Sequence, residues 1–142
     1  IYLRNPGNQA VATSGQQPQT APALGPAQSV NVPANQAWTD TGIIVARGER
    51  IQFTSSGDIM VAEGASSGVG GSPIAPQGRL PVVAAGVGAL IARIGNGNAF
   101  LLGSNNTPIP MPANGRLMLG VNDYNFTDNS GTFTVGITRL GR

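Results

Sequence analysis

The sequence predicts an all-β protein: a two-sheet, jelly-roll-like sandwich preceded by an extended N-terminal arm. Apolar residues alternate with polar or small ones along several short segments, which is typical of strands with one buried face. The 142 residues include 21 Gly and 11 Pro, and no long segment has helical periodicity. A chain of this length suits a single domain.

Residues 1–28 are expected to form the arm and residues 29–142 the sandwich. After the β-capable segment Ile1-Tyr2-Leu3, the arm is rich in Gly, Pro, Gln, Ala and Thr, a composition typical of a linker. Extended at about 3.3 Å per residue, it would reach on the order of 90 Å, well beyond a domain with a radius of gyration of about 13 Å. We therefore expect self-association, in which Ile1, Tyr2 and Leu3 pair with a sheet edge of a neighbouring molecule. The alternative is a tether to another domain.

About eight strands are expected in the sandwich. They lie in segments 29–32, 42–45, 50–54, 59–61, 88–94, 99–102, 117–121 and 132–137. The Asn-Gly dipeptide at 96–97 is a strong hairpin signal. The Gly-, Ser- and Pro-rich segment 57–86 is expected to be mostly loop, where a binding surface could form.

Missing residue types exclude several chemistries. The chain has no His and no Cys, so a Ser-His-Asp triad, a thiolate nucleophile and the usual zinc site cannot be built. Its eight basic residues are all Arg and give a net charge of +2, spread along the chain rather than clustered as nucleic-acid binding requires. No apolar run is long enough to span a membrane. We expect a non-catalytic protein that neither binds nucleic acid nor crosses a membrane.

The loop between the last two predicted strands concentrates oxygen ligands. It runs from Asn122 to Ser130 and carries carboxylate, amide and hydroxyl groups without a basic side chain. Calcium binds about six to eight such oxygens, but Asn, Asp and Ser also dominate ordinary turns, and composition alone favours a turn. Asp123 and Asp128 could also form a glycosidase-type carboxylate pair, although a chelating loop would use the same oxygens. Glu49, in a predicted turn, is expected to be solvated.

Together with the segments before it, this loop resembles that of the PA-I-type, calcium-dependent galactophilic lectin family. The resemblance covers roughly residues 30–138 and rests on Trp38, GERIQF at 48–53, PQG at 76–78, GALIARIG at 88–95 and the ND…DNSG loop at 122–131. It implies a galactose-binding-like β-sandwich in which Asp123, Asp128 and Asn129 bind Ca²⁺, which then binds sugar hydroxyls. Asn122, Asn125 and Thr127 are expected to supply carbonyls or orienting hydrogen bonds.

The chain also departs from the family pattern. Its loop is shorter, Asp128 replaces the first Asn of the family's pair, and segment 57–78 is longer. The family's sugar-contacting His has no counterpart, so galactose specificity is not implied and the sugar is left open. Tyr124 and Trp38 are the candidate ligand-facing aromatics. The alternatives are simple loop exposure for Tyr124 and a core position for Trp38.

Two classes of function follow from the sequence. The first is an extracellular or cell-surface module, of a bacterial secreted type, that binds calcium and through it a carbohydrate. The second is a structural subunit of an extracellular filament or other assembly, joined by donation of the N-terminal arm to a neighbouring subunit. The two are compatible, because a lectin-type sandwich can also serve as a building block.

Overall fold

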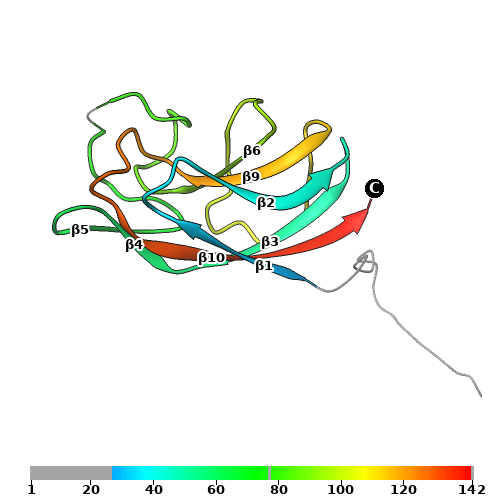
Figure 1. Cartoon of the computed structure of the whole chain (residues 1–142), viewed down its shortest axis with the longest axis horizontal. Coiled ribbons are helices and arrows are strands. Elements are labelled where there is room, and N and C mark those ends of the chain that lie inside the picture. The colour runs from blue at the N-terminus through cyan, green and yellow to red at the C-terminus, as the bar shows by residue number, and fades with distance from the viewer. Residues whose placement is uncertain (1–26, 77, 142) are drawn as a thin grey trace, which may run out of the picture.

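The computed structural model describes residues 27–76 and 78–141. These residues form two antiparallel sheets that pack face to face (Figure 1), so the predicted all-β sandwich is confirmed. The predicted assembly residues Ile1, Tyr2 and Leu3 lie outside the described residues, as does nearly all of the predicted arm. No helix in the described part is long and apolar enough to span a membrane.

Within residues 27–76 and 78–141, ten strands build the two sheets. They are β1 (Gln28–Pro33), β2 (Trp38–Val45), β3 (Arg50–Ser56), β4 (Asp58–Ala62), β5 (Ala65–Gly68), β6 (Leu90–Ile94), β7 (Phe100–Leu101), β8 (Ile109–Pro110), β9 (Gly115–Val121) and β10 (Ser130–Gly141). One sheet contains β1, β3, β4, β5, β8 and β10, and the other has the order β2-β9-β6-β7.

Strand β10 organises the larger sheet. Residues 132–137 of β10 pair with β1 along one edge, while the other edge pairs with β4 and then with β3. β3 and β4 follow each other along this edge with a bend at Gly57, whose φ is 114°. A Cβ at Gly57 would lie 2.9 Å from the carbonyl oxygen of Thr132. Glycine is therefore required at the bend, both for the positive φ and for the close approach.

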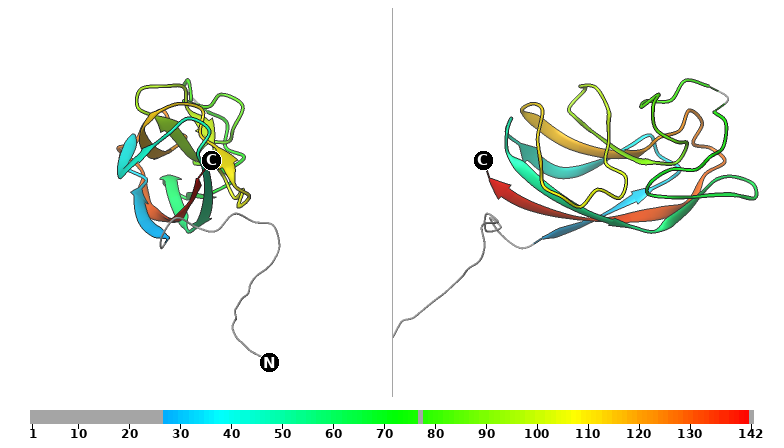
Figure 2. Two further views of the ribbon diagram at one scale, coloured as in Figure 1. Left: turned by 90° about the vertical axis from the view of Figure 1, so that its right-hand side faces the viewer. Right: turned by 180° about the vertical axis from the view of Figure 1, so that it is seen from behind.

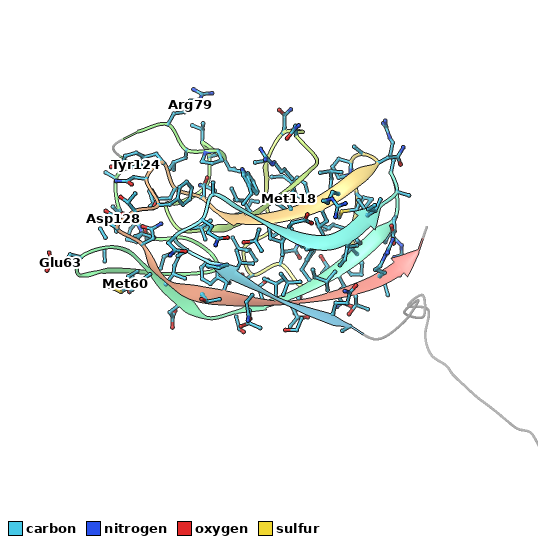
Figure 3. All side chains as sticks on the ribbon, in the orientation of Figure 1. Met60, Glu63, Arg79, Met118, Tyr124 and Asp128 are labelled. Carbon is cyan, nitrogen blue, oxygen red and sulfur yellow. The ribbon has the colours of Figure 1, made fainter. Side chains whose placement is uncertain are left out.

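The core lies between the sheets, where side chains of both fill the space (Figure 3). The alternating residues of the predicted strands are the buried ones: Ile51, Phe53, Leu117, Leu119, Val121, Phe133, Val135 and Ile137. Each such side chain stabilises the fold by about 1.5–3 kcal/mol through its transfer from water. Period-two alternation therefore identified the strands that hold the two sheets together.

Some of the strand predictions were incomplete. β2 begins at Trp38 rather than at Gly42, β5 forms within the expected loop insertion, and β8 forms in a proline-rich segment. β5 pairs with β4, and Ile109 of β8 pairs with Ile51 of β3, so both strands depend on partners rather than on their own alternation. The predicted hairpin around Asn96-Gly97 is confirmed by the pairing of β6 with β7.

The two ends of the sandwich carry different polar groups. β9 and β10 belong to different sheets, so the loop between them crosses from one sheet to the other at one end (Figures 1 and 2). The far end of β10 carries Arg139, and the β2–β3 turn beside it carries Glu49. The candidate loop and the Glu49–Arg139 pair thus lie at opposite ends of β10.

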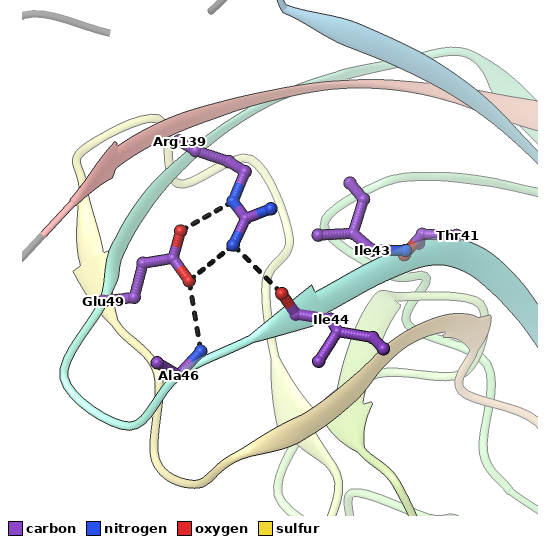
Figure 4. A network of polar contacts seen from close by, with 6 residues as sticks. All are labelled: Thr41, Ile43, Ile44, Ala46, Glu49 and Arg139. Carbon is purple, nitrogen blue, oxygen red and sulfur yellow. Dashed lines mark hydrogen bonds and ion pairs between the residues drawn. The ribbon is translucent and has the colours of Figure 1, made fainter. Parts of the chain in front are cut away.

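Glu49 is buried, so the expectation that it is solvated is wrong. Its Oε2 accepts a hydrogen bond from Arg139 Nε at 2.6 Å, and its Oε1 accepts from Arg139 NH2 at 2.9 Å and from the amide of Ala46 at 3.1 Å (Figure 4). Arg139 also donates to the carbonyl of Ile44 at 3.0 Å. The pair joins the turn after β2 to the end of β10, which belongs to the other sheet.

Candidate metal and ligand site

A pocket of about 230 Å³ opens at the end of the sandwich where the β9–β10 loop crosses between the sheets. Its walls are Val61 and Ala62 at the end of β4, residues 74–76 of the insertion, Val87, and the loop residues Asp123, Tyr124, Asn125 and Asp128. Tyr124 and Asp128 lie together at this end of the molecule in Figure 3. The structure therefore brings several of the predicted site residues to one pocket.

Asp123 is the buried acidic group of this site, with 3% of its surface exposed. Its Oδ1 accepts hydrogen bonds from the amides of Tyr124 at 2.7 Å and Asn125 at 3.3 Å, and its Oδ2 accepts from Asn129 Nδ2 at 2.9 Å. The ion pairs among the described residues do not include Asp123. A buried carboxylate with dipoles but no counter-charge is costly, so a cation at this position would be stabilised.

Asn129 is also buried, and its orientation is fixed. Its Nδ2 donates to the carbonyl of Ala34 at 3.0 Å as well as to Asp123 Oδ2. A flipped amide would place its oxygen against two other oxygens, so Oδ1 must face the other way. That Oδ1 is buried and has no hydrogen-bond partner in the described part of the chain. An unsatisfied buried acceptor costs about 1–3 kcal/mol, which a bound cation would recover.

Asn122 holds the pocket's surroundings together rather than facing into it. It is fully buried, and its Oδ1 accepts from the amide of Val82 at 2.9 Å. Its Nδ2 donates to the carbonyls of Val82, Ala85 and Gly86 at 3.0, 3.3 and 3.0 Å. These hydrogen bonds hold residues 82–86 against the end of β9, and a role of Asn122 in orienting metal ligands stays a prediction.

Asn125 and Thr127 stabilise the loop itself. Asn125 Oδ1 accepts from the amide of Thr127 at 3.1 Å and from its Oγ1 at 2.8 Å, the arrangement by which Asx residues cap a turn. Their side chains thus fix the loop's shape, while Asp128, exposed on the pocket wall, offers a second carboxylate. Of the six predicted metal residues, Asp123, Asp128 and Asn129 offer side-chain oxygens for a cation.

Val61 and Ala62 of β4 line the pocket and were not named individually by the sequence analysis, although it expected a binding surface within segment 57–86. β4 pairs with β10 only through Ile59 and Met60, and the β4–β5 register shifts between Met60 and Ala62. Val61 and Ala62, which line the pocket, therefore lie where the regular ladder is interrupted, and a backbone oxygen there is a candidate fourth ligand. The sequence signals for these residues were the short apolar run at 59–61 and its place inside the Gly-, Ser- and Pro-rich segment.

The donor set suits calcium. The candidate ligands are two carboxylates, an amide oxygen and a backbone carbonyl, all of them oxygens of the kind calcium prefers. In residues 27–76 and 78–141, no three His, Cys, Asp or Glu side chains gather where they could hold a metal ion. These four groups offer fewer oxygen ligands than the six to eight that calcium takes when each binds through one oxygen, which would leave coordination positions for outside oxygens.

Tyr124 forms an exposed wall of the pocket, with 45% of its surface accessible. A Cβ at Gly78 would lie 2.7 Å from Tyr124 Cδ2 and 2.8 Å from Cγ, so the ring packs directly on the Gly78 backbone. The insertion thereby positions the loop's aromatic side chain. Tyr124 is placed where a ligand in the pocket would touch it.

Trp38 lies away from the pocket, on the outer face of the β2-β9-β6-β7 sheet. Its ring lies so close to Gly120 that a Cβ there would be 2.9 Å from Trp38 Cε3. The guanidinium of Arg93 lies 4.4 Å from the ring centroid, a cation–π contact. Protein groups therefore already contact the ring, and stacking of a sugar on Trp38 stays a prediction.

The fold and the family define this chain as a lectin domain, a binding module rather than an enzyme. It belongs to the PA-IL-like protein family, which it matches over residues 27–141, and the expected resemblance is confirmed. A similar solved structure is the EclA N-terminal domain, a PllA-like lectin, with a TM-score of 0.65 and 29% identity over 78% of this chain and 94% of that chain. A comparison with curated proteins finds no match.

Proposed function

We propose that this domain binds carbohydrate through a calcium ion held by the β9–β10 loop. The observation that carries the proposal is the buried Asp123 carboxylate, which has no ion-pair partner among the described residues, beside the unsatisfied Oδ1 of Asn129. Both groups would gain from a cation, and both belong to the loop that lines the pocket or supports it. Membership in a family of lectins supports the same conclusion.

The residues have distinct roles in this proposal. Asp123, Asp128 and the Oδ1 of Asn129 hold the ion, with a backbone oxygen from Val61 or Ala62. Calcium, when bound, supplies open coordination positions that a pair of adjacent sugar hydroxyls can fill. Hydrogen bonds from the amides of Tyr124 and Asn125 and between Asp123 and Asn129 fix the side chains of Asp123 and Asn129 without the ion.

The pocket favours a small, neutral ligand bound weakly. Its volume of about 230 Å³ is below the usual range for drug-sized ligands, about 300–1,000 Å³, and suits a single sugar residue. Tyr124 offers an aromatic wall, and residues 74–76 offer an apolar one. Calcium sites of extracellular modules bind at about 10⁻⁴–10⁻³ M, so an extracellular or cell-surface location, where calcium is abundant, is part of the proposal.

A glycan array probed with the full chain in calcium and again in chelator tests this function. We expect binders that disappear in chelator and with Asp123→Asn, but persist with Asp58→Asn, a matched change at an exposed acid of β4. Binding that survives in chelator would place the sugar site elsewhere, for example at Trp38. An array without any calcium-dependent binder would leave the ion with a structural role only.

A further inference from the structure

A second cavity, of about 470 Å³, lies on one open side of the sandwich. β7 and β8 are the terminal strands of their two sheets, and the segment that contains both runs across the gap between the sheets (yellow in Figure 2). The cavity is lined by Phe100, Leu101, Ile109 and neighbouring prolines, and no charged side chain contributes to it. Leu101 is 50% exposed. We call this cavity the β7–β8 groove.

The groove's own backbone disfavours strand addition. Pro110 lies in β8 and Pro112 follows it. Proline has no N–H to donate, and prolines on edge strands protect the edge from pairing with another chain. A partner would therefore be held through apolar side chains inserted between the two edges rather than through a longer ladder.

Residues 1–26 supply a segment with the matching chemistry. Ile1-Tyr2-Leu3 is the one place in this stretch where three large apolar or aromatic residues are consecutive. The chain enters the described part beside Gln28, which pairs with Ile137 of β10. The chain between Leu3 and Gln28 spans up to about 80 Å at about 3.3 Å per residue, so Ile1–Leu3 can reach a groove well outside its own domain.

Composition favours the groove of another molecule over the chain's own. β1 and β8 are separated by β10 and β3, which places Gln28 about 15 Å from its own groove at about 4.8 Å per strand. Pro18, Pro22 and Pro26 precede β1, and proline restricts the backbone of a linker. Each proline makes a tight return toward the groove of the same copy less favourable, so the sequence favours the groove of a second copy.

From these observations we propose that Ile1-Tyr2-Leu3 of one copy of this chain inserts into the β7–β8 groove of a second copy. Each copy would donate one segment and accept another, a head-to-tail contact that can extend into an open filament when the rotation does not close. The groove lies away from the loop pocket and shares no lining residue with it. The proposal is therefore independent of calcium and sugar binding.

Sedimentation velocity of the full chain over a wide concentration range, in chelator, tests the contact. We expect the parent to self-associate, and Leu101→Ser or Tyr2→Ser to weaken the association about tenfold or more through loss of an apolar anchor. Ile44→Ser is the matched control, because Ile44 is 61% exposed but lies outside the groove, and it should assemble like the parent. Circular dichroism confirms that each variant is folded.

A mixing experiment separates exchange between copies from docking within one copy. Tyr2→Ser keeps an intact groove, and Leu101→Ser keeps an intact segment, so an equimolar mixture should form a 1:1 complex although each variant alone is largely monomeric. A parent that stays monomeric at every concentration overturns the proposal, as does a Leu101→Ser chain that assembles like the parent. A mixture that stays monomeric while the parent assembles overturns it as well.

Discussion

Each end of the sandwich buries one acidic side chain, and the two acids are satisfied in different ways. Glu49 is 5% exposed and Asp123 is 3% exposed. Glu49 meets Arg139 through two hydrogen bonds, at 2.6 and 2.9 Å. Among the described residues, Asp123 accepts hydrogen bonds from two backbone amides and from the side-chain amide of Asn129. One end therefore contains its own cation, whereas the other has an arrangement that an external cation would complete.

The difference shows how two buried carboxylates in one fold can have different roles, one structural and one a candidate for binding an ion. The ion pair between Glu49 and Arg139 links the two sheets, and both carboxylate oxygens of Glu49 accept hydrogen bonds within it. The Asp123 cluster instead combines a carboxylate that lines a pocket and has no ion-pair partner among the described residues with the unsatisfied Oδ1 of Asn129 in the same loop. Burial alone does not identify a functional acid, and the incomplete compensation of Asp123 is what makes it the candidate.

Replacing Arg139 with Met should have the largest effect on stability, because it makes the Glu49 end resemble the Asp123 end. Loss of one partner of a buried ion pair costs about 3–5 kcal/mol. The Arg139 side chain is 38% exposed, so solvent relieves part of the loss, and we expect a fall of about 2–3 kcal/mol in the free energy of unfolding. Urea denaturation in chelator and in calcium should give the same loss.

Arg116→Met is the matched control for that experiment. Arg116 pairs with Asp40 at 3.4 Å, but both side chains are 49% exposed, and such surface pairs contribute about 0–1 kcal/mol. Equal losses of stability for the two variants would refute the distinction between the buried Glu49–Arg139 pair and the surface Arg116–Asp40 pair.

The hydrogen bond from Arg139 to Glu49 raises the pKa of Arg139, and burial lowers it by less. The stability this pKa shift reflects is full at neutral pH and is lost only as the pH rises through the raised value.

Asn122→Ala tests the hydrogen bonds that hold residues 82–86 against the end of β9. It should have the second-largest effect on stability. It removes a fully buried side chain and leaves polar backbone groups between Val82 and Gly86 without their partner. Unsatisfied buried groups cost about 1–3 kcal/mol, so we expect a loss of about 2 kcal/mol by urea denaturation. Hydrogen exchange should accelerate first in residues 82–86. Unchanged hydrogen exchange in residues 82–86 would contradict the proposal that the hydrogen bonds of Asn122 hold this segment in place.

Asp128→Asn should affect calcium without affecting the fold. Asp128 is exposed on the pocket wall, so its loss should change stability in chelator by less than about 0.5 kcal/mol. Removing one of two carboxylates should weaken calcium binding about tenfold, measured by isothermal titration calorimetry. Glu63→Gln, a change at another acid of the same end outside the pocket lining, is the control. Equal affinities for the Asp128 and Glu63 variants would argue against Asp128 as a ligand.

Gly78→Ala should have the smallest effect on calcium binding and should separate the sugar from the ion. The new methyl group would force Tyr124 to move, since the ring lies within 2.7 Å of the Cβ position. Tyr124 is 45% exposed, so its ring has room to rotate away, at a cost of about 1 kcal/mol. We expect unchanged calcium affinity and weaker sugar binding by calorimetry. Weaker calcium binding would mean that the segment around Gly78 contributes to the calcium site and does not only position Tyr124 as a pocket wall.

Local patterns predicted much of this molecule, and partners far apart in the sequence decided the rest. Alternation located strands such as β9 and β10, and the cluster of oxygen-bearing side chains located the loop at 122–130. The burial of Glu49 depends on Arg139, which is distant in sequence, and the turn around Glu49 contains no sign of that contact. Val61 and Ala62 entered the site through an interrupted strand ladder, which composition does not reveal.

Thermal melting of the parent and of Asp123→Asn, in chelator and in excess calcium, tests whether the Asp123 end uses an external cation. Calcium at about 100 times its dissociation constant would stabilise the native state by about 2.7 kcal/mol, a rise of about 10 °C in melting temperature for a domain of this size. We expect this rise in the parent and in Arg139→Met, and none in Asp123→Asn. Coincident melting curves for the parent in chelator and in calcium would contradict the account.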